Sequence, residues 1–238
     1  MKKLNIAIFY ATLFLYTTLV ADNTALKMII EKVPMIKNIN AHVTQVEVHK
    51  GLYQFKAEVR GPRPGRLEGF ITKDFKNIVM GKGYDAQTGQ QLSIPFNIDI
   101  KALKNVAAYK MGNGKDEYFL FTDPECPYCQ TLEHKLTSIK DNVTLYVILY
   151  PLSFHKNAKN MCRYILNQKD DEARAQAMKE VANHSTNYAN VKYSTMEFNI
   201  LNDKIQKSLN VADKIGINAT PMILNAQGLQ VSDMAVRN

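Results

Sequence analysis

The apolar residues in the first third of the chain follow two different spacings. Residues 25–36 repeat apolar side chains every three or four positions, which predicts a helix, with Pro34 near its end. After it, apolar and polar residues alternate, which predicts short strands separated by a turn at Lys50-Gly51 and a loop over Gly61–Gly65. This pattern is typical of a small α+β unit whose helix covers one face of an antiparallel sheet. The strands are expected at residues 43–48, 52–59, 69–72 and 78–80.

The rest of the chain alternates strands with helices, which indicates an α/β domain. Residues 142–150 form a β-branched and aromatic run typical of a strand at the centre of a parallel sheet. Residues 157–189 are mostly helical and are longer than a single crossover helix between two strands needs to be. We interpret them as a helical insertion. Two more strands are expected at 118–121 and 222–224, a short one at 229–231 after a turn at Gly228, and helices at 97–109, 130–139 and 201–214.

Composition narrows the class of protein. The chain has 238 residues, 46% hydrophobic and 22% charged, which argues against disorder and allows one large domain or two small ones. The net charge of +8 comes from scattered lysines, without an arginine-rich helix or a nucleic-acid motif. No nucleic-acid partner is therefore expected.

The first residues have the pattern of an export signal. Lys2 and Lys3 precede an apolar stretch over residues 4–20, and a polar sequence begins at Asp22. We interpret residues 1–21 as a signal peptide cut after Ala21. An uncleaved membrane anchor is the less favoured alternative, because tyrosines and threonines dilute the apolar stretch. Export would place the protein in the periplasm, an oxidising compartment where a cysteine pair can cycle between thiol and disulfide.

The sequence Cys126-Pro127-Tyr128-Cys129 lies between an expected strand and an expected helix. A cysteine at a helix start is favoured as the thiolate, because unpaired N–H groups and the positive end of the helix dipole stabilise the anion. Pro127 suits the first helical turn, where its missing N–H is not needed. We expect Cys126 to be the exposed, attacking sulfur and Cys129 to be the resolving sulfur that releases a mixed disulfide.

Thr220-Pro221 lies directly before the strand expected at residues 222–224 and forms the second part of the expected site. If the bond before Pro221 is cis, the main chain of Thr220 can face the sulfur pair. An extended client segment could then hydrogen bond with that main chain, which depends little on the client's sequence.

Other interpretations of the cysteines are weaker. A metal site lacks further ligands at ordinary spacing, and haem attachment would need a histidine where Gln130 stands. A purely structural disulfide within so small a ring adds little stability. No metal and no cofactor are expected. Cys162 is interpreted as a buried packing residue, and His155, Met161 and Met178 as ordinary packing or surface residues.

Two motifs together resemble the periplasmic disulfide isomerases of the DsbC/DsbG family: residues 121–129, with the Cys-Pro-Tyr-Cys form of the DsbG branch, and Gly216–Pro221. A weaker match covers residues 78–85. The threonine before the proline is shared by both branches, whereas the oxidase DsbA typically has valine there.

This resemblance implies an α/β thioredoxin-like domain with a helical insertion, preceded by a small α+β cystatin-like dimerisation domain and a linker helix. The domains would cover residues 22–90 (dimerisation), 91–112 (linker helix) and 113–238 (catalytic, with the insertion at about 155–190). It also implies a homodimer, misfolded or unfolded exported proteins as substrates, and a membrane electron donor of the DsbD type. The expected site residues are the catalytic pair Cys126 and Cys129 and the substrate-binding residues Thr220, Pro221 and Tyr128.

The chain departs from this family in two places. Cys162 lies near the first cysteine of a second, structural disulfide found in DsbC, but no partner cysteine follows it. The family ends with a helix after the last strand, whereas residues 232–238 provide only about two helical turns. We therefore expect one face of the sheet to be thinly covered.

The leading hypothesis is an exported thiol–disulfide oxidoreductase that isomerises or reduces wrong disulfides in other proteins. A dimeric oxidase that donates its disulfide and a reductase of sulfenylated cysteines use the same chemistry. A holdase that binds unfolded chains, with secondary redox activity, is the alternative from a different class. The direction of electron flow depends on the reduction potential and on the redox partner, which the sequence does not specify.

Overall fold

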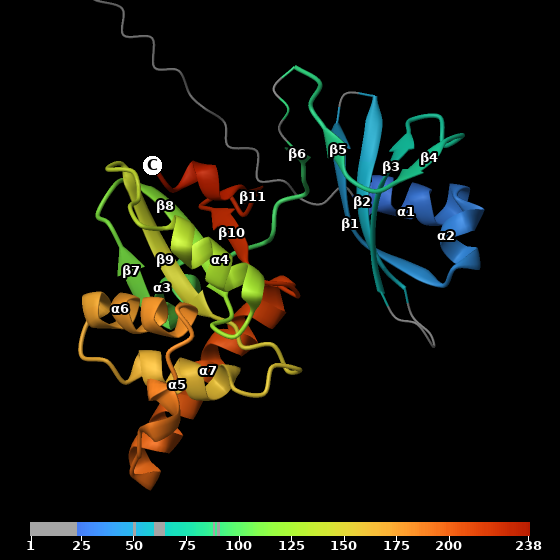
Figure 1. Ribbon diagram of the computed structural model, residues 1–238. Coiled ribbons are helices and arrows are strands. Elements are labelled where there is room, and N and C mark those ends of the chain that lie inside the picture. The colour runs from blue at the N-terminus through green and yellow to red at the C-terminus, as the bar shows by residue number, and fades with distance from the viewer. Residues whose placement is uncertain (1–22, 50, 60–64, 88, 90) are drawn as a thin grey trace, which may run out of the picture. The chain divides into compact units, whose positions relative to one another are not determined.

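The computed structural model describes residues 23–49, 51–59, 65–87, 89 and 91–238. The chain divides into two compact units, the first ending at Ile94 and the second beginning at Pro95 (Figure 1). The expected signal peptide and residues 61–64 of the expected loop lie outside the described residues. Within the described ranges, no helix is both long enough and apolar enough to cross a membrane.

In the first unit, two short helices pack on a four-stranded antiparallel sheet with strand order β1-β2-β3-β4. Ile29 and Ile36 of the helices meet Phe55 of the sheet in a core with almost no exposed surface. The single helix expected over residues 25–36 is interrupted at Val33, because Pro34 cannot donate to a continuing helix and begins a second one. The elements are α1 (Asn23–Lys32), α2 (Pro34–Asn38), β1 (Ala41–His49), β2 (Leu52–Val59), β3 (Gly65–Thr72), β4 (Ile78–Met80), β5 (Gly83–Tyr84) and β6 (Gln91–Leu92).

The α+β arrangement of this unit agrees with the sequence pattern. Its cystatin-like character and its role in dimerisation remain predictions.

The second unit is built on a five-stranded mixed sheet with strand order β11-β10-β8-β9-β7. Strands β8 and β9 are parallel, as the sequence predicts for the sheet centre, and the remaining pairs are antiparallel. The elements are α3 (Ile100–Val106), β7 (Tyr109–Met111), β8 (Asp116–Thr122), α4 (Pro127–Lys135), β9 (Val143–Leu149), α5 (Ala158–Leu166), α6 (Asp171–Ala182), η1 (Asn187–Asn190), α7 (Thr195–Ile215), β10 (Met222–Asn225), β11 (Gln230–Val231) and η2 (Asp233–Ala235).

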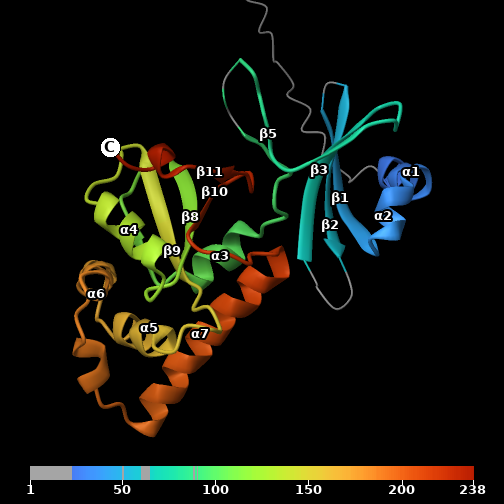
Figure 2. The same ribbon diagram turned by 45° about the vertical axis from the view of Figure 1, so that its right-hand side comes forward.

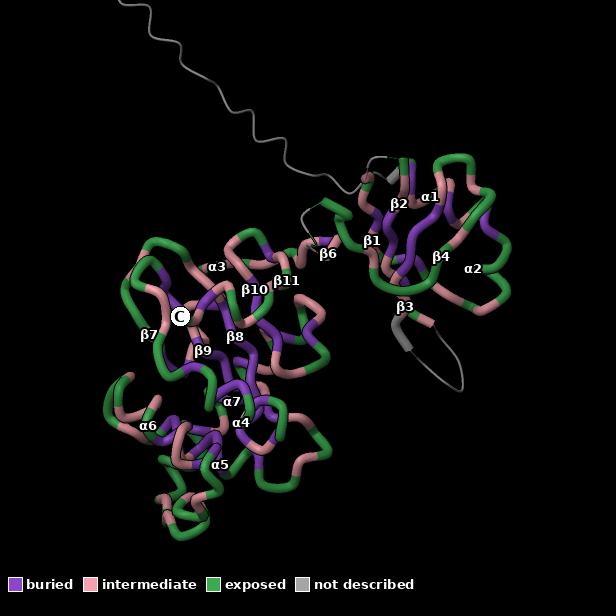
Figure 3. The backbone as a smooth tube through the Cα atoms, turned by 45° about the horizontal axis from the view of Figure 1, so that its top comes forward, coloured by how far each residue is buried: buried purple, intermediate pink, exposed green. Residues whose placement is uncertain are grey.

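Helices cover both faces of this sheet (Figure 2). Along β8, Leu120 points to the face packed against α4, α5 and α6, whereas Phe119 and Phe121 point to the face packed against α3 and α7. This alternation follows from the two-residue period of a strand. Most residues of β9 and the last four residues of β8 are buried (Figure 3).

The helix expected at 97–109, within the predicted linker 91–112, is much shorter than predicted. The side chain of Asp99 caps its start by accepting a hydrogen bond from the N–H of Ala102 at 3.1 Å. Tyr109 already belongs to strand β7 and pairs with Val147 of β9. Leu103 is fully buried against the sheet, so α3 is a packed part of the second unit rather than a free connector.

Two other helices differ from their predicted bounds. Helix α7 begins at Thr195 rather than residue 201, because Ser194 and Glu197 form a reciprocal capping box. It ends at Ile215 and is followed by Gly216, whose φ of 89° is the left-handed conformation that glycine adopts readily. Helix α4 ends at Lys135 rather than 139.

The expectation that one face of the sheet is thinly covered is wrong for the described second unit. The C-terminal residues form the short η2 turn instead of a helix, and Val236 is fully buried in the same core as α4. Arg237 forms a β-bridge with Ile139, which ties this segment to the residues after α4. The C-terminal segment therefore packs on this core through the buried Val236 and the partly buried Ala235.

Candidate redox site

Cys126 is the residue immediately before helix α4, and Pro127 is the first helical residue. The N–H of Cys126 donates to the carbonyl of Asp123 at 3.1 Å, and its carbonyl accepts from the N–H of Gln130 at 3.0 Å. Because strand β8 ends at Thr122, the chain turns from strand to helix within a few residues. This turn places the first sulfur at the end of the helix that carries unpaired N–H groups.

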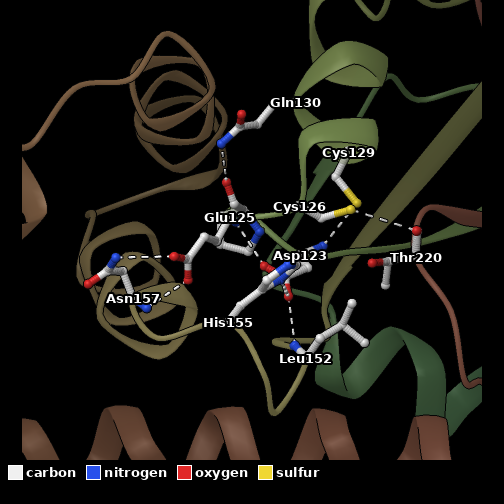
Figure 4. A network of polar contacts seen from close by, with 10 residues as sticks. Asp123, Glu125, Cys126, Cys129, Gln130, Leu152, His155, Asn157 and Thr220 are labelled. Carbon is white, nitrogen blue, oxygen red and sulfur yellow. Dashed lines mark hydrogen bonds and ion pairs between the residues drawn. The ribbon is translucent and has the colours of Figure 1, made fainter.

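Thr220 and Pro221 lie beside this helix start, although they are far away in the sequence. Strand β10 pairs with β8, with Met222 opposite Phe121, and this pairing brings the preceding residues to the cysteine pair. The Thr220–Pro221 peptide bond is cis, as the site hypothesis assumed. The Cys126 sulfur lies 3.9 Å from the Thr220 carbonyl oxygen (Figure 4). The structure therefore brings the two sequence motifs together at one place.

The prediction of an exposed Cys126 needs correction. Cys126 is only 5% exposed and Cys129 is 1% exposed, because the first sulfur lies against the Thr220 carbonyl and the second faces the protein interior. Tyr128, between them, is 78% exposed. The accessible surface between the two cysteines thus belongs to the exposed residues Pro127 and Tyr128.

Cys129 lies in an environment that favours the neutral thiol. The N–H of Asp123 donates to its sulfur at 3.4 Å. Burial raises the pKa of Cys129 to about 12, against smaller opposing effects of this hydrogen bond and of the Thr220 and Thr122 hydroxyls. Cys129 therefore remains protonated at neutral pH, and it must lose its proton before it can attack a disulfide.

The carboxylate of Asp123 is fully buried and accepts hydrogen bonds from three directions (Figure 4). One oxygen accepts from the Leu152 N–H at 2.6 Å and from His155 Nδ1 at 2.8 Å, and the other accepts from the Glu125 N–H at 2.8 Å. The interpretation of His155 as an ordinary packing or surface residue is therefore wrong.

One signal in the sequence could have identified this pair. Asp123 follows the carboxyl end of β8, and His155 lies in the loop after β9. Since these strands are parallel neighbours, their carboxyl ends meet at one edge of the sheet.

Glu125 connects the same turn to helix α5. Its carboxylate accepts from the backbone N–H of Asn157 at 2.6 Å and from the Asn157 side chain at 3.1 Å. Asn157 is the residue just before α5, so the start of the insertion is anchored beside the cysteine pair. The loop that carries His155 is consequently held at both ends.

A second buried carboxyl group lies further along α4. Glu133 is 4% exposed, and its Oε1 has no hydrogen-bond partner among the described residues. Burial raises the pKa of Glu133 to about 7, and the positive charge of Lys179 opposes this only in part. Nothing in the sequence pattern distinguishes this glutamate from an exposed helical one.

Cys162 is fully buried, in agreement with its interpretation as a packing residue. Burial raises the pKa of Cys162 well above its usual range, and the nearby charge of Asp123 adds to this effect. Among the residues that the structure covers, no cluster of three or more His, Cys, Asp or Glu side chains could hold a metal ion.

Comparison with known proteins identifies the family of the second unit. A family model described as a thioredoxin-like domain matches residues 103–235, more than half of the chain. The chain belongs to the thioredoxin-like family. The match includes every expected site residue, from Cys126 to Pro221.

One relative has a related name. The chain is 39% identical over 97 residues to a probable thiol:disulfide interchange protein DsbC of Bordetella avium. The alignment covers 35% of this chain and 32% of that protein, so the chain spans about a third of the relative's length. The family match agrees with the thioredoxin-like domain expected from the sequence, and the name of the relative is that of a thiol:disulfide interchange protein.

Solved structures with similar folds carry related titles. A disulfide interchange protein from Neisseria gonorrhoeae is 24% identical with a TM-score of 0.43, and covers 57% of this chain and 88% of that chain. ScsC of Proteus mirabilis in a compact conformation is 24% identical with a TM-score of 0.44, and covers 60% of this chain and 78% of that chain.

Proposed function

We propose that this protein is an exported thiol–disulfide oxidoreductase that isomerises or reduces non-native disulfides in other exported proteins. The observation that carries the proposal is the position of the Cys126 sulfur at the start of α4, 3.9 Å from the Thr220 carbonyl. The helix start directs unpaired backbone N–H groups toward the attacking sulfur, and the adjacent main chain can align a client segment against it.

The reaction begins when the Cys126 thiolate attacks one sulfur of a client disulfide. A bond forms between Cys126 and that sulfur, the client's disulfide bond breaks, and the second client sulfur leaves as a thiolate. In isomerisation, another client thiolate then attacks the mixed disulfide and releases Cys126 unchanged. In reduction, Cys129 attacks the Cys126 sulfur, the enzyme pair is oxidised, and the client gains two electrons.

Three residues are proposed to contact the client. The main chain of Thr220, next to Pro221, provides hydrogen-bonding groups that are independent of the client's sequence. Tyr128 provides a large, exposed aromatic surface beside the attacking sulfur. This combination suits an enzyme that acts on many partly unfolded proteins.

The remaining parts of the proposal follow the resemblance to disulfide isomerases. Thr220 before the proline favours isomerase or reductase activity over oxidase activity. Dimerisation through the first unit, a periplasmic location and a membrane electron donor of the DsbD type are proposed on the same basis. The redox state of the pair in cells tests the direction, because a mostly reduced pair supports an isomerase or reductase and a mostly oxidised pair supports an oxidase.

The direct test is refolding of a client with scrambled disulfides. Cys126→Ala should abolish refolding, and Cys129→Ala should accumulate a mixed disulfide between Cys126 and the client. Cys162→Ala is the matched control, because this thiol is buried away from the attacking position and its removal should leave refolding intact. Refolding that survives Cys126→Ala would overturn the proposal.

The same variants address the holdase alternative. If Cys126→Ala abolishes refolding but still suppresses client aggregation, the protein binds unfolded chains separately from its redox chemistry. If aggregation suppression is absent in the wild-type protein, the holdase alternative fails.

A further inference from the structure

One side chain connects the two segments that form the redox site. Tyr150 directly follows strand β9, and its backbone N–H donates to the carbonyl of Thr122, the last residue of β8, at 2.8 Å. Its hydroxyl lies 3.1 Å from the carbonyl oxygen of Ile217, in the loop between α7 and β10. Tyr150 therefore contacts both the strand end that leads to Cys126 and the loop that leads to Thr220.

The loop between α7 and β10 is anchored at its two ends. At its start, the N–H of Ile217 donates to the carbonyl of Ala212 in α7 at 2.9 Å. At its end, Met222 begins β10 and pairs with β8. Between these ends, residues 218 and 219 are exposed. The hydroxyl of Tyr150 adds a further anchor, which holds the loop to the end of β9.

The position of this loop determines where the Thr220 carbonyl lies relative to the attacking sulfur, at 3.9 Å from it. A client segment that hydrogen bonds with the main chain of Thr220 can present its disulfide to Cys126 only if this spacing is kept, because attack requires aligned reacting atoms. A small disulfide without a peptide chain forms no such hydrogen bonds. Its reaction with Cys126 should therefore depend little on the loop.

We propose that Tyr150 is a positioning residue that holds the Thr220 loop at the spacing that client polypeptides need, which makes the site selective for disulfides in polypeptides over small disulfides. This inference rests on the proposed oxidoreductase function. The chemical step is the same for both kinds of substrate. The Cys126 thiolate attacks one substrate sulfur, a bond forms between them, the substrate disulfide bond breaks, and the second sulfur leaves as a thiolate.

The surroundings of the hydroxyl allow its role to be tested by removing one atom. A second acceptor, Oδ1 of Asp213 in the last turn of α7, lies 2.7 Å from the hydroxyl, so two acceptors in the same part of the chain share its single proton. The rest of the Tyr150 side chain packs against the core that contains Phe121 and Ile217. Tyr150→Phe therefore removes the link to the loop and keeps the packing.

Tyr146 provides a matched control on the same strand. It packs against the same core as Tyr150. Its hydroxyl donates to Oε1 of Glu117 at 3.2 Å, and Glu117 lies near the start of β8, whereas Thr122 is at the end of that strand. Tyr146→Phe thus removes a hydroxyl whose partner belongs to β8 rather than to the Thr220 loop.

The test compares the rates at which Cys126 forms a mixed disulfide with two probes, a disulfide-bonded peptide and hydroxyethyl disulfide. All variants carry Cys129→Ala, so that the mixed disulfide accumulates and can be followed by mass. We expect Tyr150→Phe to lower the second-order rate constant for the peptide about fivefold, the size of change that one lost hydrogen bond produces. The rate constant for hydroxyethyl disulfide should change less than about 1.5-fold, and Tyr146→Phe should keep the parent ratio of the two rate constants.

The ratio of the two rate constants separates positioning from a general loss of structure. Both probes react with the same folded molecules, so a variant that is partly unfolded loses activity toward both in equal proportion. Only a displaced Thr220 loop should change the reaction with the peptide and leave the reaction with hydroxyethyl disulfide intact.

The outcomes also separate this inference from the proposed function. If the parent protein forms no mixed disulfide with either probe, the proposed function fails and the inference fails with it. If the parent reacts but Tyr150→Phe keeps the parent ratio, whether both rates are unchanged or both fall equally, the positioning role alone is overturned. An equal, peptide-selective loss in Tyr146→Phe would overturn the assignment to Tyr150 as well.

Discussion

Two buried carboxyl groups, Asp123 just before α4 and Glu133 within it, are in opposite situations. Asp123 accepts hydrogen bonds from two backbone N–H groups and an imidazole. Glu133 is almost as deeply buried, yet one of its oxygens has no partner among the described residues. The two buried groups therefore differ in how far hydrogen bonds replace their lost hydration, although they lie in one short segment.

The difference shows that burial alone does not decide the state of an acid. A carboxylate that accepts several hydrogen bonds can remain ionised inside a protein, because these bonds replace its hydration. A carboxyl group without such bonds retains its proton to higher pH, as the raised pKa of Glu133 indicates. The start of α4 accordingly provides hydrogen-bond donors for its buried carboxyl group, whereas one oxygen of Glu133 has no partner among the described residues.

The largest effect is expected for Asp123→Ala. This change leaves the N–H groups of Leu152 and Glu125 without an acceptor in a closed site, so the free energy of unfolding should fall by about 3 to 5 kcal/mol. Urea unfolding measures this loss. Asp141→Ala, at an exposed position, should barely change the midpoint. A loss for Asp123→Ala as small as that of Asp141→Ala would show that the network contributes little to stability.

Glu133→Gln should change how stability depends on pH. Since the pKa of Glu133 rises from 4.5 to about 7 on folding, the native state holds the proton more tightly than the unfolded state. This contribution is fully present below pH 4.5 and is lost as pH rises to about 7. The variant should therefore match the wild type near pH 4.5 and exceed it by about 3 kcal/mol above pH 7.

This second experiment is best performed with both active-site cysteines replaced by alanine, so that thiol ionisation adds no pH dependence. Unfolding free energies that differ by the same amount at all pH values would contradict the assignment of a titrating, buried Glu133.

Removal of a buried hydroxyl group should have a smaller effect on stability. The Ser208 hydroxyl lies within hydrogen-bond distance of two carbonyl acceptors, Leu149 at 2.7 Å and Ile205 at 2.8 Å. Ser208→Ala should therefore lower the free energy of unfolding by about 1 kcal/mol. Thermal unfolding of the reduced protein provides the measurement. An unchanged transition would mean that this buried hydrogen bond contributes nothing net.

Tyr109→Phe should have the smallest effect. The Tyr109 hydroxyl is buried and lacks a hydrogen-bond partner among the residues described, so its removal leaves no group unsatisfied. We expect the free energy of unfolding to change by less than about 0.5 kcal/mol or to rise slightly. A clear loss of stability on thermal unfolding would instead reveal a contact made by this hydroxyl.

The parts predicted well from sequence depend on short-range rules. The strands around the cysteines follow from short, continuous runs of apolar, β-branched and aromatic residues, and Pro127 marks the first turn of α4. Helix bounds depend on capping as well as on apolar spacing: α3 is shorter and α7 is longer than the spacing predicts, since Asp99 and Ser194 cap their starts.

The Asp123–His155 contact could not be assigned in the same way. These residues are separated by a helix and a strand, and their contact depends on the parallel pairing of β8 with β9. The burial of Cys126 likewise depends on the Thr220 carbonyl, which only the pairing of β10 with β8 brings near. The sequence shows the chemical type of each side chain, but it does not show which side chains and carbonyl groups lie next to it in the fold.

The sequence by itself determined which chemistry is available: a cysteine pair at a helix start and a proline-bearing strand, set in an alternating α/β pattern. Only the tertiary structure decided how each ionisable side chain is solvated. The reason is physical, because desolvation and hydrogen bonding act through space, and the groups that surround Asp123, Cys129 and Glu133 come from segments far apart in the chain.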